Sequence, residues 1–112
     1  MNELLLINKS QNMTSFDVVA IVRKTLNIKK VGHTGTLDPN ADGLMIILID
    51  KATKALPFLH LDKKEYIASL KLGIKTITGD IWGEVIEQGS IPILTKEMIE
   101  YSLKSFLGKS IQ

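Results

Sequence analysis

The sequence predicts an α/β or α+β domain with a mixed, largely antiparallel sheet flanked by helices. Apolar runs of strand length alternate with amphipathic helical patterns, but they lack the regular βαβ spacing of a parallel sheet. No repeat, linker or low-complexity stretch interrupts them. A chain of 112 residues that is 45% hydrophobic is long enough to bury one small core but not two. We therefore expect one domain with a single core.

Three elements are predicted in the first half of the chain. Residues 3–7 form a short apolar run typical of a buried strand. A helix is predicted at 15–27, because residues 12–15 supply turn and N-cap side chains and apolar residues then recur at helical spacing. The unbroken apolar run at 44–49 predicts a strand that is buried on both faces and belongs to the core.

The middle of the chain predicts one helical turn and one further strand. The turn is expected at 51–56, capped by Asp50 and disturbed by Pro57. Residues 65–72 alternate between apolar and polar side chains well enough to predict a strand that ends at Gly73.

The last third predicts a loop, a strand and a helix. Residues 74–83 are rich in threonine and glycine and are expected to form a loop, and 84–88 is a candidate strand. Thr95 is expected to cap a helix. The apolar face of this helix carries Ile99, Leu103, Phe106 and Leu107.

Composition excludes several classes of protein. Without cysteine, the chain has no disulfide framework, thiolate metal site or thiol nucleophile. The two histidines, His33 and His60, lie far apart in sequence, so no metal is expected. The first residues lack a basic segment and their apolar run is short, which favours neither secretion nor a membrane span. These features indicate a cytoplasmic protein without a metal.

The net charge of +2 is small, but positive residues are unevenly distributed. No acidic residue lies between Asp17 and Asp38. This interval contains Arg23, Lys24, Lys29 and Lys30, which are candidates for contacts with a phosphate backbone. Charge alone favours the alternative of an ordinary solvated helix face and its exit turn, because clustered lysines are common on surfaces.

The segment 32–43 is the strongest candidate for a functional loop. Hydrophobic periodicity disappears there, and Asp38 and His33 stand out among glycines and threonines. Pro39 restricts the backbone of Asp38, and the predicted strand that follows anchors the loop. The alternative is that Asp38 only makes an Asx turn. The glycines do not have the spacing of a phosphate-binding or dinucleotide-binding loop.

Residues 32–44, which read GHTGTLDPNADGL, and residues 51–54, which read KATK, resemble the signature of bacterial tRNA pseudouridine-55 synthases of the TruB type. Shorter stretches extend the resemblance through nearly the whole chain. They are LINK at 6–9, MTS at 13–15, KEY at 64–66, the segment from Leu72 to Gly83, and the final residues 106–112.

The resemblance implies that Asp38 is the nucleophile that converts a uridine of the tRNA TΨC arm to pseudouridine, without a cofactor. Attack at C6 of the uracil and attack at C1′ of the ribose both remain open. The target base must leave its stack, so His33 is expected to fill the space and contact the displaced nucleotide. Tyr66 is expected to stack on the flipped base, whereas without the resemblance it would be an ordinary core aromatic.

Two turns depart from the family pattern. The usual Lys-Pro-x-Gly is replaced by KSQN at 9–12, and Asp50 stands where glycine is usual. Asn12 and Asp50 tolerate left-handed backbone better than most residues, so we expect the fold to accommodate both changes.

The resemblance also implies that residues 1–112 are the N-terminal portion of the catalytic domain. The family's second half, with an active-site arginine, and its accessory RNA-binding domain have no counterpart here. We therefore expect the isolated chain to be inert and to self-associate through an uncovered sheet edge. Two alternatives are a non-catalytic RNA-binding fragment or degenerate relative, and a plain structural domain in which 32–43 is only a turn.

Overall fold

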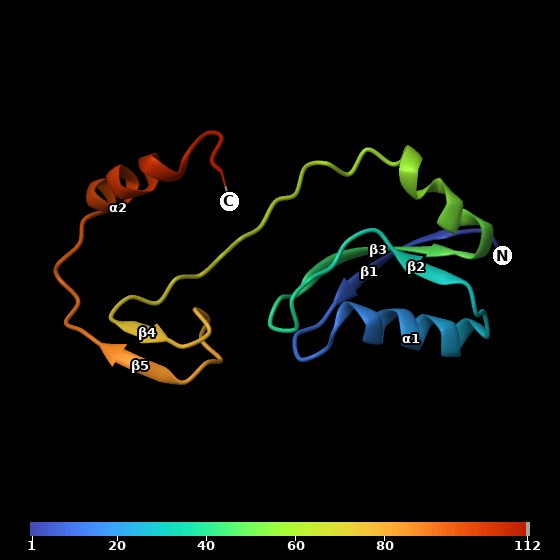
Figure 1. The fold of residues 1–112 in the computed structure, drawn as a ribbon, viewed down its shortest axis with the longest axis horizontal. Helices are drawn as coiled ribbons and strands as arrows, with labels where there is room; N and C mark the ends of the chain where they lie inside the picture. Colours follow the sequence, from blue (N-terminus) through green and yellow to red (C-terminus); the bar gives the residue numbers. More distant parts are fainter. Residues whose placement is uncertain (112) are drawn as a thin grey trace. The chain divides into compact units, whose positions relative to one another are not determined.

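A computed structural model describes residues 1–111 of the chain. The chain forms two compact units, one over residues 1–67 and one that begins at Ala68 (Figure 1). Helices and antiparallel strand pairs occur in both units, which confirms the predicted fold class. The single hydrophobic core that the composition predicts lies in the first unit.

The first unit is built on a three-stranded antiparallel sheet in the order β1-β3-β2. Strands β1 (Leu4–Lys9) and β3 (Gly43–Ile49) confirm that the two predicted strands form, with small shifts of their ends. The prediction that the first strand is buried is wrong, because Leu4 and Leu6 of β1 are exposed. Strand β2 (Val31–His33) pairs with β3 on the side opposite β1. Strand β3 is the central strand, so its backbone is paired on both sides. A long apolar run is typical of such a central strand.

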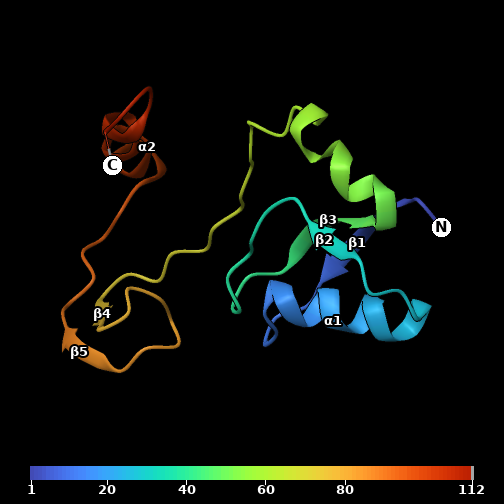
Figure 2. The same ribbon diagram turned by 45° about the vertical axis from the view of Figure 1, so that its right-hand side comes forward.

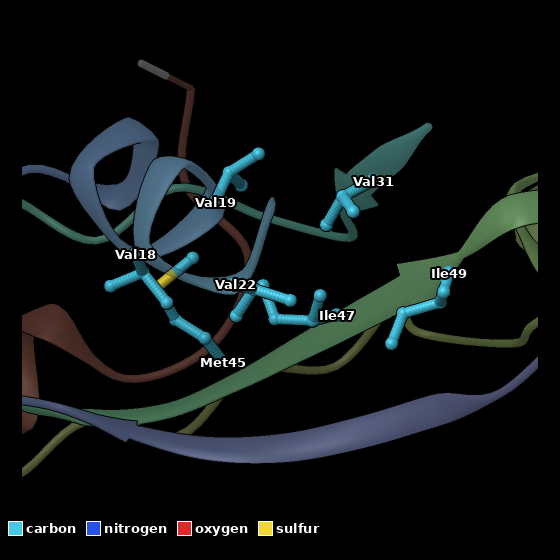
Figure 3. Packing of buried hydrophobic residues seen from close by; sticks show 7 residues of the cluster. All are labelled: Val18, Val19, Val22, Val31, Met45, Ile47 and Ile49. Carbon is cyan, nitrogen blue, oxygen red and sulfur yellow. The ribbon is translucent and has the colours of Figure 1, made fainter. Parts of the chain in front are cut away.

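Helix α1 (Ser15–Leu26) covers one face of this sheet and confirms the helix predicted at 15–27. Its valines pack against alternate residues of β3, and Figure 3 shows Val18 and Val22 beside Met45 and Ile47. Complete burial stabilises each such aliphatic side chain by about 1.5–3 kcal/mol. The core consists of Val18, Val19, Val22, Val31, Met45, Ile47 and Ile49.

Both ends of α1 are capped. Thr14 and Asp17 form a capping box, in which the Thr14 hydroxyl accepts from the Asp17 N–H at 3.0 Å and the Asp17 carboxylate accepts from the Thr14 N–H at 2.8 Å. The hydrogen bond from the Thr14 backbone N–H to the carboxylate, and after it the nearby Thr14 side chain, hold the pKa of Asp17 below its ordinary value of 3.8. At the other end Asn27 adopts the left-handed conformation, with φ of 54°.

The opposite face of the sheet is only partly covered. The 3-10 helix η1 (Asp50–Phe58) lies on that face (Figures 1 and 2), and Thr53 approaches Gly32 there. Leu48 is buried, but Leu44 at the start of β3 is 62% exposed. The prediction that the 44–49 strand is buried on both faces is therefore wrong at its first residue, because α1 covers only the other face.

The predicted turn at 51–56 lies within η1, but Asp50 does not cap it. Residue Ile49 occupies the N-cap position, and no side chain makes a cap hydrogen bond. Asp50 instead adopts a left-handed backbone with φ of 53°, and its carbonyl oxygen accepts from the Thr53 hydroxyl at 2.7 Å. Asn12 is also left-handed, with φ of 65°, so both departures from glycine are accommodated as expected.

Two sequence predictions are wrong in the middle of the chain. Residues 65–72 form no strand, because no other strand pairs with them, and Ile67 is 98% exposed. The predicted loop at 74–83 begins with strand β4 (Ile74–Thr76), which pairs with β5 (Val85–Gln88). Strand β5 confirms the prediction at 84–88.

The second unit contains the β4–β5 hairpin and helix α2 (Lys96–Leu103), followed by the 3-10 turn η2 (Lys104–Phe106). Thr95 caps α2 as predicted, since its hydroxyl accepts from the Met98 N–H at 3.2 Å. Of the predicted apolar face, only Ile99 and Leu103 lie in α2, and both are exposed. The prediction is wrong for Phe106 and Leu107, because α2 ends at Leu103; Phe106 lies in η2, and both residues are exposed. From Ala68 to Ile111 no residue is buried.

Candidate functional site

Asp38 lies in the connection between β2 and β3. Its carbonyl oxygen accepts from the Ala41 N–H at 3.0 Å, which closes a turn with Pro39 in the second position. Its side chain is exposed and, within residues 1–111, makes no hydrogen bond or ion pair. Within residues 1–111 the carboxylate therefore forms no Asx turn, contrary to the alternative interpretation, and is open to solvent.

The chain is held on both sides of Asp38. On one side, the Ser15 hydroxyl accepts from the Leu37 N–H at 2.9 Å and donates to the Leu37 carbonyl oxygen at 3.1 Å. On the other side, the Asn12 N–H donates to the Pro39 carbonyl oxygen at 2.8 Å. The connection between β1 and α1 thus fixes the two neighbours of Asp38.

That connection is itself fixed by a buried lysine. Lys9, the last residue of β1, is 1% exposed. Its ammonium group donates to the carbonyl oxygens of Ser10 at 2.8 Å and Met13 at 2.9 Å. These bonds bridge the turn that carries Asn12, so the support of the Asp38 loop extends back to the sheet.

His33 is the last residue of β2 rather than a loop residue, which corrects the prediction that the loop begins at Gly32. It pairs with Ile47 of β3 and is half-buried. Its Nδ1 lies 2.8 Å from the Gly35 carbonyl oxygen. A carbonyl oxygen only accepts, so Nδ1 carries a proton, and in the neutral ring Nε2 is left as an acceptor.

Tyr66 lies in the segment between η1 and β4, which has no helix or strand, and is 64% exposed. It is therefore not the packed core aromatic of the alternative interpretation. The same segment approaches the Asp38 loop at Lys64, whose ammonium nitrogen lies 3.8 Å from the position that a Cβ on Gly35 would occupy.

The basic residues lie around the C-terminal end of α1. A shallow depression there is lined by Ala20, Arg23, Lys24, Asn27, Ile28 and Lys29. Arg23 is partly committed to the fold, because it donates to the Val31 carbonyl oxygen at 3.1 Å and lies over the Phe16 ring. Lys24, Lys29 and Lys30 are exposed, and neither ion pair found in residues 1–111 involves them.

Asp38 and the basic residues lie toward opposite ends of α1. Ser15, which holds the Asp38 loop, begins the helix, whereas Lys24 lies in its last turn. Twelve helical residues at 1.5 Å each separate the two ends by about 18 Å. The exposed lysines and the Asp38 loop therefore lie at different ends of the helix.

The sequence indicated Asp38, His33 and Tyr66 as candidates, but it did not indicate the groups that hold the loop. The TS pair at 14–15 indicated a helix cap, and Thr14 does provide it. No local pattern indicated that Ser15 holds the Asp38 loop, because its partner Leu37 lies 22 residues later.

Residues 1–111 contain no cluster of three side chains suited to hold a metal ion. The same residues include no helix that is long and apolar enough to cross a membrane.

A family model described as TruB family pseudouridylate synthase (N terminal domain) matches residues 23–112. The match includes Asp38, His33 and Tyr66. This chain belongs to the TruB family. The family match agrees with the resemblance found in residues 32–44.

TruB-family relatives named tRNA pseudouridine synthase B match nearly the whole chain. The relative from Alkaliphilus oremlandii is 53% identical over 109 residues, which cover 97% of this chain and 36% of the relative. The relative from Clostridium perfringens is 48% identical over 108 residues, which cover 96% of this chain and 37% of the relative. This chain therefore spans little more than a third of the length of these TruB-family relatives.

A solved structure of an H/ACA RNP bound to a substrate RNA containing 2'-deoxyuridine includes a chain that is 39% identical to this one. The alignment covers 50% of this chain and 18% of the other, with a TM-score of 0.48.

Proposed function

We propose that this chain is the N-terminal portion of the catalytic domain of a tRNA pseudouridine synthase, an isomerase that converts uridine 55 of the TΨC arm to pseudouridine. The observation that carries the proposal is the Asp38 carboxylate. It is exposed, makes no hydrogen bond or ion pair with any residue from 1 to 111, and lies on a loop held at both neighbouring residues, in a chain of the TruB family.

In this proposal Asp38 acts as a nucleophile without a cofactor. Its carboxylate adds to C6 of the uracil or attacks C1′ of the ribose, and the bond between N1 and C1′ breaks. The base turns, C5 bonds to C1′, the bond to the Asp38 carboxylate breaks and returns its electron pair to the carboxylate, and the hydrogen on C5 leaves as a proton. A carboxylate without hydrogen bonds keeps its lone pairs for this attack, which fits the exposed Asp38 side chain.

His33 and Tyr66 are proposed to hold the displaced nucleotide. The Nδ1 bond to Gly35 orients the His33 ring beside the loop and leaves Nε2 for a substrate contact. Tyr66 is exposed and can offer its ring face to a flipped base. Its segment approaches the loop at Lys64, two residues earlier, which favours a role for Tyr66 near Asp38.

The macromolecular partner in this proposal is tRNA, in the cytoplasm. Lys24, Lys29 and Lys30, with the exposed part of Arg23, would contact backbone phosphates away from the target uridine. Their separation from Asp38 along α1 suits a folded RNA arm better than a single nucleotide.

The remaining residues of the active site, including an arginine, are proposed to come from the second half of the catalytic domain. The relatives are more than twice as long as this chain, and residues 68–111 bury none of their apolar side chains. By itself the chain is proposed to self-associate with a second copy through the free edge of β1, near exposed Leu6 and Leu44.

A non-catalytic RNA-binding fragment is the second candidate. It is favoured by the length of the chain, which is 37% of the Clostridium perfringens relative, and by the absence of a core in residues 68–111. The two candidates differ in whether the carboxylate of Asp38 is required.

The experiment joins residues 1–112 to the remaining C-terminal part of the Alkaliphilus oremlandii relative, and compares this fusion with its Asp38→Asn variant. Pseudouridine in unmodified tRNA transcripts is quantified by chromatography of the nucleosides. We expect Asp38→Asn to abolish product while tRNA binding persists, and Asp42→Asn, a change at another exposed loop carboxylate, to keep activity within about threefold. Normal product formation by Asp38→Asn would refute the proposal.

A further inference from the structure

Ser15 makes two hydrogen bonds that its helix does not need. The N-cap function belongs to Thr14, whose hydroxyl accepts from the Asp17 N–H. The Ser15 hydroxyl is directed instead to Leu37, where it accepts from the N–H at 2.9 Å and donates to the carbonyl oxygen at 3.1 Å. A serine hydroxyl has one proton to donate and can also accept. Ser15 uses both capacities on Leu37.

The hydroxyl side of this pair of bonds is buried. Ser15 is 3% exposed, whereas Leu37 is half-buried, so water has limited access to the two bonds. Without the hydroxyl, the N–H of Leu37 would lose its partner in a partly buried setting and the loop would move to find another. Leu37 directly precedes Asp38, so such a movement would shift the carboxylate.

The Asn12–Pro39 bond holds the other side of Asp38, but it does not replace the Ser15 bonds. It fixes the carbonyl group after Asp38, whereas Ser15 fixes both backbone groups of the residue before it. With only one of these two contacts the loop could rotate about it, whereas the two contacts together fix the orientation of Asp38.

We propose that Ser15 is a positioning residue that sets the Asp38 carboxylate for attack, through its paired hydrogen bonds to Leu37. The inference rests on the proposed nucleophilic role of Asp38. A loss of alignment affects the reaction step more than the binding of a large RNA, which depends on many other contacts. Removal of the hydroxyl therefore lowers kcat and leaves KM for tRNA nearly unchanged.

The control is Thr14→Ala, which removes the cap of the same helix but no bond to the loop. In the fusion with the Alkaliphilus oremlandii C-terminal part, we expect Ser15→Ala to lower the single-turnover rate about 30-fold, with KM within about threefold. We expect Thr14→Ala to lower the melting temperature and to keep the rate within about twofold. If Ser15→Ala does not fold, Ser15→Cys fills the same volume with a weak donor and serves instead.

A second measurement needs no catalysis. In the 112-residue chain, amide hydrogen exchange is followed at Leu37 by NMR. We expect the Leu37 N–H to be protected in the wild type and in Thr14→Ala, and to exchange at least about tenfold faster in Ser15→Ala. Fast exchange in the wild type would show that the bond is not made, and would overturn the inference whatever the state of the fusion.

The outcomes separate the two proposals. If Asp38→Asn is inactive but folded Ser15→Ala keeps a normal rate, the positioning role is wrong and the nucleophile stands. The positioning role is also wrong if Thr14→Ala loses as much rate as Ser15→Ala, because helix stability then explains both. If Asp38→Asn is active, the nucleophile itself is wrong, and no role for Ser15 in its attack remains.

Discussion

The backbone N–H of Asn12 donates to the carbonyl oxygen of Pro39 at 2.8 Å, and so links the turn before α1 to the residue that follows Asp38. Asn12 makes this bond from a left-handed conformation, with φ of 65°. An ordinary residue is strained there, whereas glycine and asparagine are not. The glycine that the resemblance leads us to expect at this turn would suit the same conformation, and asparagine accommodates it.

The first prediction concerns this left-handed turn. We expect Asn12→Ala to lower the free energy of unfolding of the chain by about 1 kcal/mol, because alanine pays the left-handed strain. Asn12→Gly should change it by less than about 0.5 kcal/mol. Urea denaturation measures both, with Gln11→Ala as the matched control in the same turn. Equal stability of Asn12→Ala and Asn12→Gly would show that the backbone strain is unimportant.

The second prediction concerns the capping box. The hydrogen bond from the Thr14 backbone N–H, and after it the Thr14 side chain, depress the pKa of Asp17 below 3.8, so the ionised form stabilises the folded chain. The stabilisation by ionised Asp17 is fully present above the pKa of this group in the unfolded chain, about 3.8. It is lost as the pH falls from there through the lower pKa of Asp17 in the folded chain. We expect Asp17→Asn to reduce the loss of stability on acidification in that range. Asp62→Asn, which removes a carboxylate from a segment without helix or strand, is the control for the change in charge.

The third prediction concerns RNA affinity. Phosphate contacts release counterions, so we expect binding of labelled tRNA to weaken steeply with salt. The double change of Lys29 and Lys30 to alanine should weaken binding and reduce the slope of log affinity against log salt by roughly two. Lys96→Ala is the control, because Lys96 lies 3.7 Å from Glu100 in an ion pair. Salt-independent binding would contradict an electrostatic role.

The fourth prediction concerns self-association. Leu6 of β1 is 65% exposed beside an edge that pairs with no other strand in residues 1–111. We expect the chain to form concentration-dependent oligomers in sedimentation velocity, and Leu6→Lys to suppress them, because a charged edge residue opposes strand pairing. Leu70→Lys, at an exposed position outside any strand, serves as the control. Oligomers that persist in Leu6→Lys would exclude the β1 edge as the interface.

Local patterns in the sequence predicted the first unit well. The valine spacing that defines α1 and the apolar run of β3 both appear in the core, where Val22 packs against Ile47. The left-handed positions Asn12 and Asp50 were also expected, because few residue types accept that conformation. Such features depend on neighbouring residues, so the sequence shows them directly.

Features that depend on distant partners were missed. Three residues are too few to show periodicity, so β2 became visible only through its pairing with β3. The alternation at 65–72 predicted a strand, but a strand requires a partner that residues 1–111 do not supply. The end of the Asp38 loop was predicted one residue too late, since β3 begins at Gly43. Its attachment to Ser15 was missed because the contact spans 22 residues.

The most direct test follows the hydrogen on uridine C5, which leaves only when C5 bonds to C1′. Transcripts of tRNA tritiated at uridine C5 are incubated with the chain alone, with the fusion to the Alkaliphilus oremlandii C-terminal part, and with the Asp38→Asn fusion. We predict release of tritium to water by the wild-type fusion, and no release above background by the other two. Release by the Asp38→Asn fusion at the wild-type rate would contradict the nucleophilic role of Asp38, and release by the chain alone would contradict the need for a second half.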